Sequence, residues 1–155
     1  MTAPSKANWL GWCYGTALVL ALFTGFGNMP LYRRYYIADI PGLAWSGDFY
    51  ANLYVHYFAG AVLLALSVYL CIVFWKQKRR NYSLTGSGLA RSVALSLVLI
   101  SGVIMAVKNL PGAVIPFPLV AVLNLGHMGL AMVAAALFAL SSILRWPWAT
   151  VRRRI

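Results

Sequence analysis

Long runs of apolar residues, separated by short polar or proline-containing stretches, dominate the hydrophobic pattern of this chain. Four runs occur, at about residues 9–27, 51–75, 89–107 and 119–144. A hydrocarbon core about 30 Å thick needs roughly 20 apolar helical residues per crossing, so each run is long enough to form a membrane-spanning helix. The pattern predicts an all-α integral membrane protein, a four-helix transmembrane bundle in which residues 1–155 form one domain.

The connections between the runs carry residues that end or restart helices. Pro30 follows the first run and cannot continue a helix. A longer connection, residues 31–50, holds both acidic residues of the protein, Asp39 and Asp48. We expect residues 83–88 to form a turn before the third run. Prolines again separate the third run from the fourth.

Composition supports the membrane interpretation. Hydrophobic residues make up 62% of the chain, above the roughly 45–50% expected of a soluble domain. The net charge of +11 would suggest nucleic-acid binding in a soluble protein. Here the basic residues lie mostly at the ends of apolar runs, where they act as topology signals and contact anionic lipids, so no nucleic-acid partner is expected.

The distribution of Lys and Arg predicts the orientation of the chain. Ten of them lie at the amino end, in the connection between the second and third runs, or at the carboxyl end, against three in the other two connections. Because cytoplasmic loops carry the excess of Lys and Arg, both termini are expected in the cytoplasm. The 31–50 and 108–118 connections then face the periplasm or the cell exterior.

Two histidines are the candidates for chemistry inside the membrane. Ionisable groups in membrane helices are costly, and apart from Arg91 at the mouth of the third span only His56 and His127 lie within the predicted spans. The lack of a deeply placed carboxylate argues against a proton pump or ion-coupled transporter. His56 and His127 lie about five and eight residues into their spans, which predicts depths that differ by only about 4–5 Å.

Two imidazoles at matched depth on different helices could bind one haem iron from opposite sides. Gly60 and Ala131 follow His56 and His127 by four residues, so they share the same helix faces and leave room for a flat ring. Arg33 and Arg34 lie at the same membrane face and could pair with haem propionates. Ordinary alternatives stay open: headgroup contacts for the arginines and interhelical hydrogen bonds for the histidines.

Short motifs at the ends of the predicted spans carry a family resemblance. Gly11-Trp12 and Thr24-Gly25 bracket the first span, and Ser101-Gly102 lies late in the third. With His56 and His127, these motifs resemble the four-helix cytochrome b (gamma) subunit of membrane formate dehydrogenases and NiFe hydrogenases. In that family the first span opens with His-Trp and ends with Thr-Gly, span two carries one histidine, and span four carries two.

The departure from the family pattern predicts a reduced, monohaem form. Family members usually hold a second haem near the cytoplasmic face, which needs a histidine early in span one and another late in span four. This chain has Asn8 or Gly11 in the first place and Leu140 or Ser141 in the second. The resemblance therefore implies one haem b near the periplasmic face. Quinone, a further candidate ligand, would exchange electrons near that haem or through a neighbouring subunit.

The expected function is that of a membrane-anchoring b-type cytochrome subunit in the bacterial inner membrane. It would relay electrons between the quinone pool and a periplasmic oxidoreductase or multihaem cytochrome. The chain has no nucleophile motif, pair of catalytic carboxylates or nucleotide loop, so the substrate chemistry would belong to the partner. The alternative is a haem-free membrane anchor or assembly subunit of a larger complex.

Overall fold

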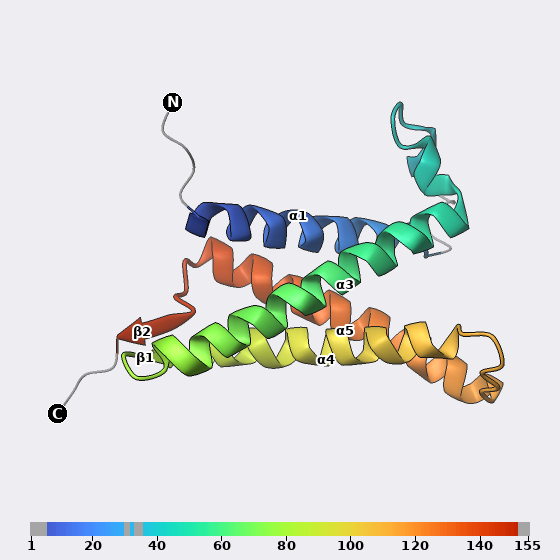
Figure 1. The fold of residues 1–155 in the computed structure, drawn as a ribbon. Coiled ribbons are helices and arrows are strands. Elements are labelled where there is room, and N and C mark those ends of the chain that lie inside the picture. The colour runs from blue at the N-terminus through green and yellow to red at the C-terminus, as the bar shows by residue number, and fades with distance from the viewer. Residues whose placement is uncertain (1–5, 30–31, 33–35, 152–155) are drawn as a thin grey trace. The chain divides into compact units, whose positions relative to one another are not determined.

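Four long helices dominate the computed structural model, which describes residues 6–29, 32 and 36–151 (Figure 1). All four are long and apolar enough to cross a membrane. The all-α membrane class predicted from the hydrophobic pattern is therefore confirmed. The helices are α1 (Lys6–Gly27), α3 (Phe49–Val73), α4 (Gly86–Lys108) and α5 (Phe117–Ile143).

Most of the apolar surface of these helices is exposed in the isolated chain. Only 6–11% of the most apolar window of each helix is buried. A helix satisfies its own backbone hydrogen bonds, so such apolar faces can lie directly against lipid acyl chains. The exposed surface is what a membrane protein presents to the bilayer.

The chain forms two compact units that divide between Val68 and Tyr69. The first contains α1, two short 3-10 helices at Ile37–Asp39 and Ala44–Gly47, and the larger part of α3. Tyr32 is fully buried, and its hydroxyl lies 2.6 Å from Ser46 Oγ. The edges of its ring pack against Phe23 and Phe26 of α1. These contacts hold the connection against the last turns of α1.

Asp48 begins α3 by capping it. The backbone N–H of Ala51 donates to Asp48 Oδ1 at 2.8 Å, and the N–H of Asn52 donates to the Asp48 carbonyl at 3.0 Å. A side-chain oxygen at this position satisfies one of the amide groups that a helix start leaves without an intrahelical acceptor. One of the two acidic residues of the protein thus has a structural role.

The second unit is built on α4 and α5, which run antiparallel and side by side (Figure 1). A π-helical turn, Phe74–Lys78, ends α3. Strand β1 (Tyr82–Leu84) pairs antiparallel with β2 (Ala149–Val151), with Ser83 opposite Thr150. Because β1 precedes α4 and β2 follows α5, the pairing fastens the open end of this helical hairpin.

The expected turn at residues 83–88 is wrong. Residues 83 and 84 belong to β1, and α4 begins at Gly86. Thr85 explains the early helix start, since its side chain accepts a hydrogen bond from the N–H of Gly88 and donates to the Pro147 carbonyl at 2.7 Å. The Thr85 hydroxyl therefore both caps α4 and binds the segment that precedes β2.

Arg91 fastens the same end of the second unit. Its side chain is buried, and its Nε and Nη2 donate to the carbonyls of Ser87 and Trp146, each at 3.2 Å. The guanidinium lies 4.3 Å from the centre of the Trp148 ring. Backbone carbonyls and an aromatic face stabilise this cation, and together they tie residues 146–148 to α4.

We predict that Gly88→Ala destabilises the second unit. A Cβ at residue 88 would overlap the backbone carbonyl oxygen of Trp148, so the β2 segment or α4 has to shift. Overpacking of this kind costs roughly 1–3 kcal/mol. Thermal unfolding of the purified variant in detergent measures the loss. Gly86→Ala is the matched control because its Cβ meets nothing within 4 Å, and an equal effect of the two substitutions would contradict the prediction.

Candidate functional site

His56 of α3 is held by the last full turn of α1. Its Nδ1 lies 3.0 Å from Thr24 Oγ1, and Thr24 is fully buried. The next residue, Gly25, lies against the same imidazole, because a Cβ built there would stand 3.2 Å from His56 Cε1. The ring therefore rests on a Thr-Gly pair that supplies a hydrogen-bond partner and the space for close approach.

The hydroxyl network assigns the tautomer of His56. Thr24 Oγ1 lies 2.6 Å from the Leu20 carbonyl oxygen, a separation that requires the hydroxyl proton between the two oxygens. With its only proton used there, Thr24 accepts a hydrogen bond from His56 Nδ1–H. The lone pair of the imidazole is then on Nε2. A histidine that binds a metal through Nε2 needs this tautomer, set by the bond at the other nitrogen.

Asn52, one helical turn before His56, anchors the Thr24 turn. It is fully buried, and its Nδ2 donates to the Thr24 carbonyl at 2.8 Å and to Asn28 Oδ1 at 2.9 Å. Gly27 makes this contact possible, since a Cβ there would lie 2.8 Å from Asn52 Nδ2. Side chains from two consecutive turns of α3 therefore contact the end of α1.

His127 of α5 has the same kind of support from α4. Its Nδ1 lies 2.8 Å from Ser101 Oγ, and Ser101 Oγ donates to the Val98 carbonyl at 2.9 Å. A Cβ on Gly102 would stand 3.3 Å from His127 Cε1. The same arrangement at His127 favours the tautomer with the proton on Nδ1 and the lone pair on Nε2.

One arrangement thus occurs in each unit: a hydroxyl residue followed by glycine on one helix, and a histidine on the next. His56 follows the start of α3 by seven residues and His127 follows the start of α5 by ten. We call each set a hydroxyl–glycine cradle, made of Thr24 and Gly25 for His56 and of Ser101 and Gly102 for His127. Each cradle brings its imidazole to the neighbouring helix in one tautomer.

The other residues predicted for the site lie in varied surroundings. A Cβ built on Gly60 would meet nothing within 4 Å, and Ala131 is partly exposed. Arg33 and Arg34 lie outside the described residues.

The sequence does not predict that Gly25 lies against His56 or that Gly102 lies against His127. Nor does it predict that Asn52 donates to the carbonyl of Thr24. Thr24-Gly25 and Ser101-Gly102 were visible as motifs, but nothing in the sequence paired them with particular histidines. The helical periodicity of a sequence relates only residues on one face of the same helix, which are three or four positions apart. The cradles join residues 32 and 26 positions apart, so only the pairing of helices brings them together.

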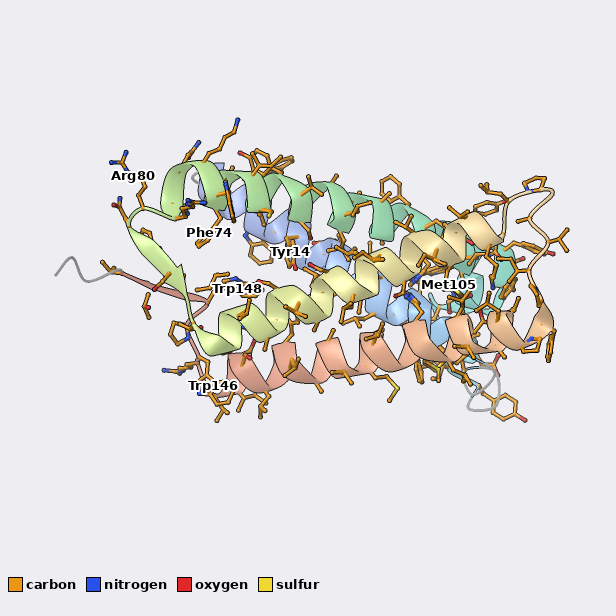
Figure 2. All side chains as sticks on the ribbon, turned by 90° about the horizontal axis from the view of Figure 1, so that it is seen from below. Tyr14, Phe74, Arg80, Met105, Trp146 and Trp148 are labelled. Carbon is orange, nitrogen blue, oxygen red and sulfur yellow. The ribbon has the colours of Figure 1, made fainter. Side chains whose placement is uncertain are left out.

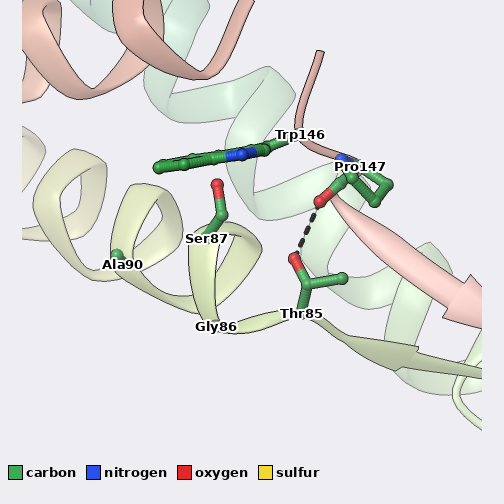
Figure 3. A pocket seen from close by; sticks show the side chains of 6 residues that line it. All are labelled: Thr85, Gly86, Ser87, Ala90, Trp146 and Pro147. Carbon is green, nitrogen blue, oxygen red and sulfur yellow. Dashed lines mark hydrogen bonds between the residues drawn. The ribbon is translucent and has the colours of Figure 1, made fainter. Parts of the chain in front are cut away.

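A shallow hollow of about 500 Å³ lies elsewhere in the second unit (Figure 3). The indole of Trp146 stands over the Ser87 hydroxyl, beside the Thr85 to Pro147 hydrogen bond. Its lining residues are Thr85, Gly86, Ser87, Ala90, Trp146 and Pro147. None of them is ionisable, and they gather at the start of α4, far along the helix from Ser101. The histidines therefore remain the stronger candidates for chemistry.

The described residues contain no cluster of three or more His, Cys, Asp or Glu side chains that could hold a metal ion by themselves. Each histidine cradle supplies one imidazole.

Comparison of the chain with models of protein families, with curated proteins and with solved structures gives no match.

We predict that the cradle hydroxyls decide the histidine tautomers. Thr24→Val keeps the side-chain shape but removes the acceptor for His56 Nδ1–H, and Ser101→Ala does the same for His127. ¹⁵N NMR of histidine-labelled protein should show the Nδ1–H form in the wild type and a mixture in each variant, at that histidine only. Loss of one such bond costs on the order of 1 kcal/mol.

Two further variants control the tautomer experiment. Thr24→Ser retains the hydroxyl and should retain the tautomer of His56. Ser96→Ala should change neither ring, since the Ser96 hydroxyl bonds only the Ser92 carbonyl of its own helix. A wild-type spectrum with the proton on Nε2 of either histidine would contradict the assignment.

We also predict that the cradle glycines resist enlargement. Gly25→Ala and Gly102→Ala place a methyl group 3.2–3.3 Å from a Cε1 atom, so the ring or the helix has to move by a few tenths of an ångström. We expect each to lower stability by about 1 kcal/mol in thermal unfolding, the low end of overpacking costs. Gly15→Ala, where a Cβ meets nothing within 4 Å, should leave stability unchanged or slightly raised. Equal stability of Gly25→Ala and Gly15→Ala would show that the close approach is unimportant.

Proposed function

We propose that this chain is a membrane-anchoring b-type cytochrome subunit that holds one haem b between His56 and His127. The observation that supports this proposal is the hydroxyl support on Nδ1 of both imidazoles, which leaves each lone pair on Nε2. An axial histidine of haem binds iron through a neutral imidazole nitrogen, and a bond at the other nitrogen fixes the ring and raises its basicity. Both histidines meet this requirement within their own units.

The residues of this chain would divide the work at such a site. His56 and His127 would bind the iron, while Gly60 and Ala131 would lie beside the ring and Arg33 and Arg34 would pair with its propionates. A bound haem would supply reversible one-electron transfer. The protein would orient the imidazoles, exclude water by its apolar helices and adjust the potential through the Thr24 and Ser101 hydroxyls.

Within a complex, the proposed role is electron relay between a periplasmic redox partner and the quinone pool. That partner would be an oxidoreductase or a multihaem cytochrome, and the bacterial inner membrane is the proposed location. The proposal rests on the four apolar helices and on the family resemblance of the Thr24-Gly25 and Ser101-Gly102 motifs. The chain would carry electrons while the partner performs the substrate chemistry.

The same hydrogen bonds favour a second candidate, a haem-free anchor or assembly subunit. Thr24 to His56 and Ser101 to His127 are bonds between helices, and such bonds stabilise membrane helix pairs without any cofactor. In that case both histidines would serve only to hold neighbouring helices together. The two candidate functions differ in whether the purified protein has the absorbance of a b-type cytochrome.

We predict that purified protein from haem-replete cells shows a reduced-minus-oxidised spectrum of a low-spin b-type cytochrome. His56→Ala and His127→Ala should each abolish the low-spin spectrum because each removes one axial ligand. Ser96→Ala, at an exposed position whose hydroxyl donates to the Ser92 carbonyl of its own helix, should keep the wild-type spectrum. Absorption spectra, with helical content from circular dichroism as the folding check, measure the outcome.

Chemical rescue separates ligand loss from misfolding. His127→Gly leaves a space into which free imidazole can diffuse, and added imidazole should restore the low-spin spectrum. Well-folded wild-type protein without any b-type absorbance would support the haem-free anchor. A normal low-spin spectrum in either alanine variant would show that the two histidines are not the axial pair.

A further inference from the structure

The end of the second unit opposite to the loop 109–116 gathers uncompensated positive charge. Lys76, Lys78, Arg79 and Arg80 follow one another at the end of α3 and just after it, and all four are exposed. Arg145, also exposed, closes α5. Figure 2 shows Arg80 extending away from the chain. We call this set of five residues the basic end.

The β1–β2 pairing brings the two parts of the basic end together. Arg80 lies two residues before β1, and Arg145 lies four residues before β2. Leu84 of β1 is opposite Ala149 of β2. Cations from the ends of α3 and α5 therefore share one end of this unit.

No Asp or Glu side chain from the same half of the chain can neutralise this charge. Residues 69–155 contain ten Lys and Arg and no Asp or Glu. Both acidic residues, Asp39 and Asp48, belong to the 31–50 connection of the other unit, where Asp48 caps α3. The counter-ions of the basic end have to come from outside this unit.

The position of the basic end along its helix identifies the surrounding medium. The candidate span Phe49–Lys78 has 30 residues, a length of about 45 Å at 1.5 Å per residue, whereas the hydrocarbon core is about 30 Å thick. The span is therefore longer than the core, and the end that carries four cations within residues 76–80 is the one expected in the headgroup layer. Trp75 is exposed there, and the Arg79 guanidinium stacks 4.4 Å from its ring centre. An aromatic ring beside a cation is typical of a membrane interface.

The cations that follow α3 lie in and just after a π-helical turn. The N–H of Arg79 donates to the Phe74 carbonyl at 2.8 Å, five residues back, in place of the usual four. Lys76, Lys78 and Arg79 are one to three residues apart, so they leave the helix in different directions around its axis. Several phosphate groups can then be contacted at once, which one row of cations along a single face does not allow.

We propose that the basic end is a binding surface for anionic phospholipid headgroups of the leaflet in which it lies. The phosphates of phosphatidylglycerol-type lipids supply the missing counter-ions, and the exposed apolar faces of α3 and α5 contact the acyl chains. Each cation near a membrane surface strengthens the attraction to anionic lipid about fivefold. The proposal does not depend on haem and holds for either candidate function.

The test is the thermal unfolding of purified full-length protein in neutral detergent with added lipid. Phosphatidylglycerol should raise the midpoint more than phosphatidylcholine at the same concentration, and the difference should shrink in high salt. Native mass spectrometry should show anionic lipid retained on the protein in preference to phosphatidylcholine. Work in detergent avoids the changed insertion that altered loop charge can cause in cells.

Two matched variants locate the lipid preference. Replacing all four of Lys76, Lys78, Arg79 and Arg80 by Gln should weaken binding of phosphatidylglycerol at least tenfold. Exchanging Lys for Arg and Arg for Lys at the same four positions keeps the charges and should keep the preference. Equal effects of the two lipids on wild-type protein, or a full preference in the Gln variant, would overturn the proposal. Equal stabilisation by inorganic phosphate would also overturn it, because the surface would then bind free anions.

Discussion

In each half of this protein, a hydrogen bond between an imidazole on one helix and a hydroxyl on the next is the interaction that selects which helix faces pair. The apolar faces of membrane helices meet lipid and protein with similar free energy, so apolar contact alone does not select partners. Thr24 with His56 and Ser101 with His127 supply that selection. Each hydroxyl also donates to a carbonyl of its own helix, and this favours the imidazole tautomer with its proton on Nδ1.

The two ends of the second unit meet different physical requirements. Along α4 toward Lys108, Ser101 and Gly102 support a polar ring inside an apolar layer. At the start of α4, Thr85 and Arg91 tie residues 146–148 to the helix through carbonyls and an aromatic ring. The first arrangement prepares an imidazole, and the second stabilises the hairpin. The support of His127 and the attachment of residues 146–148 are thus separated along one helix.

The proposed cytochrome role and the proposed lipid surface concern different parts of the chain and are compatible. An electron relay needs its redox group held at a defined depth, and contacts with headgroups oppose movement of a helix along the membrane normal. The basic end includes the last turn that follows α3, the same helix that carries His56. Headgroup contact at one end of a helix therefore bears on the depth of a histidine carried by that helix.

The sequence by itself determined the membrane class and the places of the four helices, because burial in hydrocarbon demands long apolar runs wherever the chain crosses. It also singled out His56 and His127, since ionisable side chains are rare there. Local pattern could not reveal β1 and β2, which are three-residue strands stabilised by each other across more than sixty residues. Likewise, only the tertiary structure paired Thr24-Gly25 with His56 and Ser101-Gly102 with His127, because those contacts depend on which helix faces meet.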